Sequence, residues 1–284
     1  MKKAGIIILI TLIVFLGAAA TIAALSSRWV KVYEHVVYFD NLPAHLEGFR
    51  ILHLSDLHSN HETRINVNIW PHIDRLDFDM AAITGDIVLD GGWRRADAIV
   101  ELNPHKDGLA ALAARVPTFF VEGNHESAHV NRFAPIMADL GIYFLRNDAH
   151  FLKVGEGYLE IIGAMEYSVM RRTTFLGLEW LLANTNPDFR LILTHQPQLF
   201  DRVKNHGQML VLAGHTHGGQ LRLPFLPTLY APGQGLFPRY GNGFYEHENA
   251  ALYVSRGIGT TYFPFRFWNR PVITVLELRQ SQHP

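Results

Sequence analysis

Five times along the chain, a short apolar run ends directly in side chains that can bind metal ions. Each run has the length and the β-branched or aromatic content of a buried strand. In α/β sheets the carboxyl ends of neighbouring strands meet at one edge, where ligands bind, so we expect these side chains to converge. They are Asp56 and His58 after residues 50–54, Asp86 after 80–83, Asn124 and His125 after 118–121, His195 after 191–193, and His215 and His217 after 209–213.

Helical patterns lie between the apolar runs, and this alternation indicates an α/β layer architecture. We expect Pro104 to break one helical pattern, because proline lacks the backbone N–H that a helix needs. Two further strands are expected over residues 29–39 and 158–162. The expected helices cover residues 65–76, 94–102, 108–115, 132–140 and 174–183.

Composition excludes several classes of function. The chain has 284 residues, of which 48% are hydrophobic, enough for one large domain with a buried core. The formal net charge of −1 gives no basic field for nucleic acid, so no nucleic-acid partner is expected. The absence of cysteine excludes disulfides, thiolate metal sites and a cysteine nucleophile. The 16 histidines agree with metal or acid–base chemistry.

The N-terminus carries an uncharged apolar run over residues 4–25. At about 1.5 Å per residue it is long enough to cross a hydrocarbon core of about 30 Å. Signal peptides have shorter apolar regions of about 7–15 residues, so we expect an uncleaved transmembrane anchor over residues 1–27. A single catalytic domain would follow over residues 28–284. Alanines near the end of the run leave a cleaved leader and a soluble enzyme as the alternative.

The charges beside this run leave the side of the membrane open. Lys2 and Lys3 precede it, and Arg28 and Lys31 follow it. The positive-inside count is therefore nearly balanced and leans only slightly towards an outside domain. We expect a single-pass protein of the inner or cell membrane.

The side chains at the five strand ends suit a binuclear metal centre. Two carboxylates, one amide oxygen and four imidazoles favour manganese, iron or zinc, and are too rich in nitrogen for calcium or magnesium alone. Seven ligands are about right for two divalent ions if one carboxylate bridges. Two cations roughly 3.5–4 Å apart can hold a shared hydroxide as nucleophile and clamp phosphoryl oxygens. His125, next to Asn124, stands where a general acid could protonate the leaving oxygen.

In this order the motifs resemble those of the calcineurin-like metallophosphoesterases, over about residues 48–279. The resemblance implies a four-layer sandwich of two mixed β-sheets flanked by helices. It also implies a role for each residue: Asp56, His58, Asp86 and His217 would hold one metal ion, Asp86, Asn124, His195 and His215 the other, and His125 would be the catalytic acid. Asp86 would bridge the two ions.

One position departs from the family pattern. The family often has a second aspartate three residues after the bridging one, where it can orient the catalytic histidine. Here that position is Leu89, and an acid comes one residue later as Asp90. Which acid supports His125 therefore stays open.

Further segments are similar to those of the membrane-anchored bacterial branch of this family: residues 48–51, 218–220, 253–259, 264–267 and 271–274. The branch implies hydrolysis of phosphodiesters or pyrophosphates, including removal of a nucleotide from UDP-2,3-diacylglucosamine in lipid A biosynthesis. We therefore expect a di-metal phosphoesterase that acts on a lipid-linked substrate. The alternatives are a phosphomonoesterase or protein phosphatase with the same metals, and a non-catalytic scaffold. A nucleotide-linked precursor is expected at the cytoplasmic face, which conflicts with the charge count.

Two groups of residues outside the motifs have two interpretations each. Arg256 and Arg266 either clamp a substrate phosphate or stack on neighbouring aromatic rings. The apolar side chains of residues 221–226 and of the aromatic run 263–268 either belong to the core or form an exposed surface that meets acyl chains or a bilayer.

Overall fold

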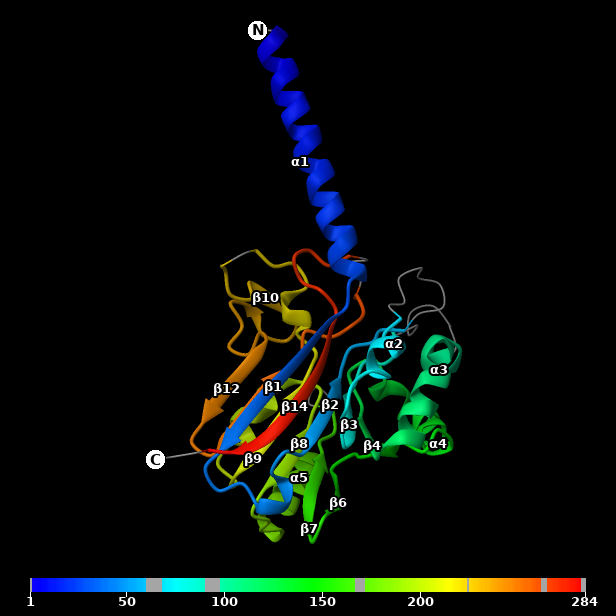
Figure 1. Cartoon of the computed structure of the whole chain (residues 1–284), viewed down its shortest axis with the longest axis vertical. Helices are drawn as coiled ribbons and strands as arrows, with labels where there is room; N and C mark the ends of the chain where they lie inside the picture. The colour runs from blue at the N-terminus through cyan, green and yellow to red at the C-terminus, as the bar shows by residue number, and fades with distance from the viewer. Residues whose placement is uncertain are drawn as a thin grey trace.

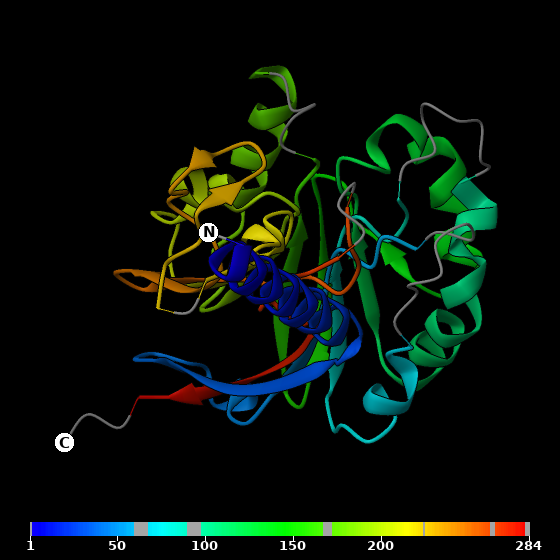
Figure 2. The same cartoon turned by 90° about the horizontal axis from the view of Figure 1, so that it is seen from above.

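Two mixed six-stranded sheets form the centre of the molecule (Figure 1). The computed structural model describes residues 2–59, 68–89, 98–166, 172–223, 225–261 and 265–281. The sheets pack face to face and helices cover their outer faces, which confirms the expected α/β sandwich of four layers (Figure 2).

In the first sheet β14 pairs antiparallel with β2, and every other neighbouring pair is parallel. The parallel pairing of β2, β3 and β4 brings their carboxyl ends to one edge. In spatial order the strands are β1 Lys31–Phe39, β14 Val272–Gln280, β2 Arg50–Leu54, β3 Met80–Thr84, β4 Thr118–Val121 and β5 Tyr143–Phe144.

The second sheet has three parallel pairs in its middle and an antiparallel strand at each edge. In spatial order its strands are β12 Gly243–His247, β13 Ala250–Val254, β9 Met209–Ala213, β8 Arg190–Leu193, β7 Gly157–Gly163 and β6 Asp148–Val154. A small two-stranded sheet consists of β10 Tyr230–Ala231 and β11 Gly235–Leu236.

The central strands are apolar throughout because both of their faces are buried. In β2 the Ile51 side chain packs between the two sheets, whereas Leu52 and Leu54 pack beneath the helices. This alternation follows from successive side chains pointing to opposite faces of a strand. The same strand therefore contributes to two cores, and its end is held rigidly where the polar motif begins.

Helices cover the first sheet on one side and the second sheet on the other. On the first sheet lie α2 Trp70–Ile73, α3 Ala98–Arg115 and α4 Val130–Asp139, and on the second lie α5 Arg172–Asn184 and α6 Phe200–Val203. Short 3-10 turns are η1 Ala44–Leu46, η2 Ser127–His129, η4 Pro197–Leu199 and η5 His217–Gly219.

Two expectations about helices were wrong. Pro104 does not interrupt the chain's helix, because α3 continues through it from Ala98 to Arg115. Leu102, Leu109 and Leu112 on either side of the proline are buried in the same core, which holds the helix together across the missing hydrogen bond. Within the described part of residues 65–76, only the single turn of α2 is helical.

The N-terminal helix α1, Lys2–Arg28, stands away from the rest of the molecule (Figure 1). By length and composition it can cross a membrane. Its last turn is fixed to the rest of the molecule: Ser27 is buried, and its Oγ atom accepts a hydrogen bond from Arg266 N at 2.7 Å. The chain passes from this turn almost directly into β1.

Candidate metal centre

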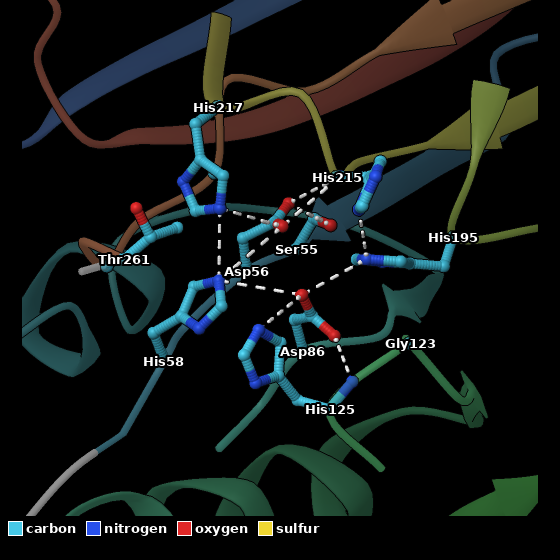
Figure 3. Close-up of polar contacts among 12 residues, drawn as sticks. Ser55, Asp56, His58, Asp86, Gly123, His125, His195, His215, His217 and Thr261 are labelled. Atoms are coloured by element: carbon cyan, nitrogen blue, oxygen red, sulfur yellow. Dashed lines mark hydrogen bonds and ion pairs between the residues drawn. The ribbon is translucent and has the colours of Figure 1, made fainter. Parts of the chain in front are cut away.

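The strand ends of both sheets meet in one buried cluster of polar side chains (Figure 3). The loops after β2, β3 and β4 carry two carboxylates and an amide, namely Asp56, Asp86 and Asn124, together with His58. The loops after β8 and β9 carry His195, His215 and His217. All seven residues expected to bind metal therefore lie together at the seam between the sheets.

One group of donor atoms surrounds His195. Its Nε2 atom lies 3.1 Å from Asp86 Oδ2, 3.2 Å from Asn124 Oδ1 and 3.1 Å from His215 Nδ1. The other ring nitrogen, Nδ1, lies 2.8 Å from the carbonyl oxygen of Thr84. This second contact fixes the ring so that Nε2 points into the cluster, as is usual for histidines that bind metals.

A second group surrounds His58 and His217, whose Nε2 atoms are 3.0 Å apart. His217 Nε2 lies 3.3 Å from Asp56 Oδ1, and His58 Nε2 lies 3.6 Å from Asp86 Oδ2. Asp86 thus faces both groups, which is the position that a bridging ligand requires. The buried oxygen and nitrogen donors are aimed at common points, so the residues present fit two divalent ions of borderline softness.

The backbone at these positions is strained. Asp56, His58, Asp86, His215 and His217 all have positive φ, between 44° and 68°. This conformation is uncommon for residues other than glycine and costs on the order of 1–3 kcal/mol at each site. Such strain persists where surrounding structure enforces it, and here it turns each side chain towards the cluster.

Two glycines allow the loops to approach the carboxylates. A Cβ atom on Gly123 would collide with the main chain and side chain of Asp86. A Cβ atom on Gly214 would collide with the side chains of Ser55 and Asp56. The glycines in these motifs are therefore needed for close packing of one loop on the next.

The electrostatics keep both carboxylates ionised. Burial raises the pKa of Asp86, but the surrounding imidazoles, His195 above all, outweigh it and hold the pKa well below its usual range. Burial of Asp56 is likewise outweighed by His217 and His58, so its pKa is also lowered. Carboxylates must be ionised to bind a cation, so the cluster is prepared for metal before metal arrives.

His125 lies beside the cluster and is the most accessible of its imidazoles. Its backbone N–H donates to Asp86 Oδ1 at 3.1 Å, and its Nε2 atom lies 3.7 Å from Asp86 Oδ2. That distance matches the 3.6 Å between His58 Nε2 and the same oxygen. Its side chain is 11% exposed, whereas the His58 and His195 side chains are fully buried. A substrate can therefore reach His125 from solvent.

Residues around the cluster support it in ways that the sequence did not reveal. The buried Glu126 carboxyl accepts hydrogen bonds from the N–H groups of Asp86, Gly123 and Val88, at 2.8, 2.8 and 3.2 Å. Burial and the nearby Asp86 carboxylate raise the pKa of Glu126 to about 8. Glu126 directly follows His125 in the sequence, but that position alone does not predict its hydrogen bonds to three backbone N–H groups.

Within the part of the chain that the structure describes, the Arg266 side chain contacts backbone carbonyls and a histidine of the cluster, and no aromatic stacking of it is found. Its side chain is fully buried, and it donates hydrogen bonds to the carbonyl oxygens of Gly259 and Arg256. Its Nη2 atom lies 3.3 Å from His217 Nδ1. Arg266 therefore connects the end of α1, through Ser27, to a residue of the metal cluster.

Asp90, the acid in question for orienting His125, falls outside the described residues.

Most of the described apolar residues in the segments 221–226 and 265–268 are not core. Six of them are between 40% and 105% exposed: Leu221, Leu223, Phe225, Leu226, Phe265 and Trp268. The described parts of these segments therefore form an exposed apolar surface, and contact of this surface with acyl chains or a bilayer stays a prediction.

Comparison with known proteins identifies the family. The calcineurin-like phosphoesterase family matches residues 49–219. The chain is 27% identical to the metallophosphoesterase YkuE of Bacillus subtilis, over 90% of this chain and 88% of YkuE. It is 30% identical to YkoQ of the same organism, over 83% of this chain and 85% of YkoQ.

A third relative has a name that specifies a reaction. The chain is 28% identical to the phosphodiesterase YaeI of Escherichia coli, over 93% of this chain and 97% of YaeI. The family match covers more than half of the chain and includes both carboxylates and the last histidine pair. The chain therefore belongs to the calcineurin-like phosphoesterase family and is a metal-dependent phosphoester hydrolase.

Proposed function

We propose that this protein is a membrane-anchored phosphodiesterase or pyrophosphatase that hydrolyses a lipid-linked substrate with two divalent metal ions. The observation that carries the proposal is that buried carboxylates and imidazoles from both sheets, together with the partly buried amide of Asn124, gather in one cluster around Asp86. Two bound cations would activate a water molecule and neutralise the phosphoryl oxygens.

Each residue of the cluster has a proposed role. One ion would be held by Asp56, His58, Asp86 and His217, and the other by Asp86, Asn124, His195 and His215. His125 would donate a proton to the leaving oxygen, because its imidazole is partly exposed and lies beside Asp86. The mixed oxygen and nitrogen donors suit manganese, iron or zinc, with manganese the first to test.

The lipid-linked substrate is suggested by what surrounds the metal cluster. The helix α1 is long and apolar enough to span a bilayer, and Arg266 links its last turn to the ring of His217. Exposed apolar side chains follow the His217 loop. The relative YaeI is named a phosphodiesterase. We take UDP-2,3-diacylglucosamine as the leading candidate, with residues 1–27 as the anchor and 28–284 as the catalytic domain.

The test uses the full-length protein in detergent, loaded in parallel with manganese, zinc or ferrous iron. It is offered UDP-2,3-diacylglucosamine, an aryl phosphodiester and an aryl phosphomonoester, and the products are identified by mass. We expect the diester to be cleaved faster than the monoester, and UMP to be released from the lipid precursor. Chelation should stop both reactions.

Other outcomes would change the proposal in specific ways. Cleavage of the aryl diester alone would retain the phosphodiesterase but discard the nucleotide-linked substrate. A monoester preference would point to a phosphatase instead. The mass of the protein isolated from whole cells, soluble and membrane fractions together, tests the anchor, because cleavage near residue 25 would shorten the chain.

A further inference from the structure

A cavity of about 470 Å³ lies at the base of α1, where the helix enters the catalytic body. One wall is apolar and comes from the last turns of the helix, including Leu25. Other walls carry the indole rings of Trp29 and Trp268. The cavity therefore lies at the depth where a membrane-spanning helix leaves the hydrocarbon region, beside residues typical of a membrane interface.

Three cations line the same cavity: Lys31, Arg256 and Arg270. Among the described residues, none of them has a carboxylate oxygen within 4.0 Å, and no acid lines the cavity. They lie over aromatic rings instead, Lys31 and Arg256 over Tyr33 at 4.3 and 5.8 Å and Arg270 over Trp29 at 5.0 Å.

Five arginines elsewhere in the described chain are ion-paired, whereas Arg115, like the cations of this cavity, lies over an aromatic ring. Ion pairs with carboxylates are made by Arg50, Arg146, Arg190, Arg239 and Arg279. Lys31, Arg256 and Arg270 differ from these five because no carboxylate lies close enough to pair with them, although Arg256 Nε donates a hydrogen bond to Asn242 Oδ1. Arg222 adds a further cation: its buried Nη1 atom has no hydrogen-bond partner among the described residues. Burial and the neighbouring Arg256 guanidinium lower the pKa of Arg222, as expected for cations gathered without an anion.

The apolar surroundings extend along the helix. A second groove, of about 550 Å³, runs beside α1 between small side chains such as Ala20 and Ala23 and the rings of Phe265 and Phe267. The cations at the base of the helix could bind a negatively charged headgroup, and the apolar groove along the helix could bind acyl chains. Together they are complementary to an amphiphile with an anionic head. Free phosphate would use only the first of these features.

We propose that the cavity at the base of α1 binds the headgroup phosphate of an anionic phospholipid. Lys31, Arg256 and Arg270 would contact the phosphate, and the acyl chains would run along α1. The inference rests on the proposed membrane span. Such a lipid would attach the catalytic domain to the bilayer at a second point, in addition to α1. It would also determine which side of the molecule faces the lipid surface.

The test is a titration of the full-length protein in dodecyl maltoside, followed by intrinsic tryptophan fluorescence, to which Trp29 and Trp268 contribute among the chain's five tryptophans. The probes are dihexanoylphosphatidylglycerol, dihexanoylphosphatidylcholine and inorganic phosphate, each added to manganese-loaded and to chelated protein. We expect saturable binding of the phosphatidylglycerol in both forms. The phosphatidylcholine and inorganic phosphate should bind at least roughly tenfold more weakly. The phosphatidylcholine headgroup has no net negative charge, and inorganic phosphate has no acyl chains.

The variant is Lys31→Gln combined with Arg270→Gln, which we expect to weaken phosphatidylglycerol binding roughly tenfold or more. The matched control is Lys153→Gln with Arg279→Gln, which removes the same charges from exposed positions on β6 and at the end of β14. The control should bind like the unmodified protein. Thermal unfolding of both variants checks that the fold is unchanged.

Three results would overturn the inference. They are equal affinity for the two lipids, equal affinity for phosphatidylglycerol and inorganic phosphate, and loss of binding on chelation, which would place the lipid at the metal cluster. Hydrolysis of an aryl diester is measured on the same samples and should be equal in both double variants. If no hydrolysis occurs with any metal, the proposed function is wrong. The lipid titration still shows whether the cavity binds an anionic phospholipid.

Discussion

Asp86 is the residue on which both groups of donor atoms depend. Its Oδ2 atom lies 3.1, 3.6 and 3.7 Å from the Nε2 atoms of His195, His58 and His125. Its backbone is fixed as well, since its N–H donates to Glu126 and its φ is 51°. A side chain shared in this way cannot be replaced by movement of a neighbour.

Replacing Asp86 with asparagine should remove both metal ions and all hydrolysis. The amide is nearly isosteric but neutral, so it cannot compensate the charge of two cations. Metal content by mass spectrometry and hydrolysis of an aryl diester measure the two effects. Asp148→Asn, on an exposed edge strand, is the control. Retention of both ions by the Asp86 variant would contradict the bridging role.

Replacing His125 with glutamine distinguishes an acid from a ligand. As an acid, His125 contributes about 10²–10⁴-fold to turnover while the protein keeps both ions. Its distance from Asp86 equally permits a ligand, in which case metal content would fall as well. We expect unchanged metal content and a turnover lowered by about that factor. His129→Gln, four residues later, should change neither quantity.

At the scale of helices and strands, the sequence predicted where the metal-binding motifs lie. It did not predict the packing and the long-range hydrogen bonds that hold these elements in place. The central strands are apolar on both faces and end where a polar motif begins, so local pattern identified them. The helix α3 was predicted to break at Pro104 because the sequence does not show how firmly Leu102 and Leu109 are packed. Arg266 was equally hidden, since its contacts with Ser27 and His217 join positions far apart in the chain.

The proline in α3 leads to a stability prediction. Pro104 is exposed within the helix, where it removes a hydrogen bond and opposes the helical geometry at a cost of up to about 3 kcal/mol. Pro104→Ala should therefore raise the midpoint of thermal unfolding, with the extra freedom of the unfolded chain offsetting part of the gain. Asn103→Ala, its exposed neighbour, is the control. An unchanged or lower midpoint for Pro104→Ala would contradict the argument.

The next residue of α3 should make stability depend on pH. His105 is buried, and burial lowers its pKa to about 4, from an ordinary value of 6.5. Below pH 6.5 the His105 imidazole binds a proton in the unfolded chain but stays neutral in the folded protein. The contribution of His105 to the free energy of unfolding is therefore complete above pH 6.5 and decreases as the pH drops towards 4. The loss is on the order of 3 kcal/mol. Denaturant unfolding of His105→Leu should show a shallower decline over this range, and an equal slope would contradict the assignment.

At the scale of the whole molecule, the metal cluster lies on the seam between two sheets that are otherwise joined by apolar packing. Asp56, His58, Asp86 and Asn124 come from the first sheet. His195, His215 and His217 come from the second. Ions bound there would cross-link the sheets at one edge, while the core between them holds the remainder.

Chelation should therefore loosen the molecule as well as inactivate it. Ions that bind only the folded state stabilise it by an amount that grows with their concentration, about 2.7 kcal/mol at one hundred times the dissociation constant. We expect the unfolding midpoint to fall on chelation and to recover with added manganese. Backbone hydrogen exchange should become faster at the carboxyl ends of β3 and β9, where the metal motifs begin. It should stay slow at the amino ends of the same two strands. Asp86→Asn should show no response to metal, and a response equal to that of the unmodified protein would place the stabilising ions elsewhere.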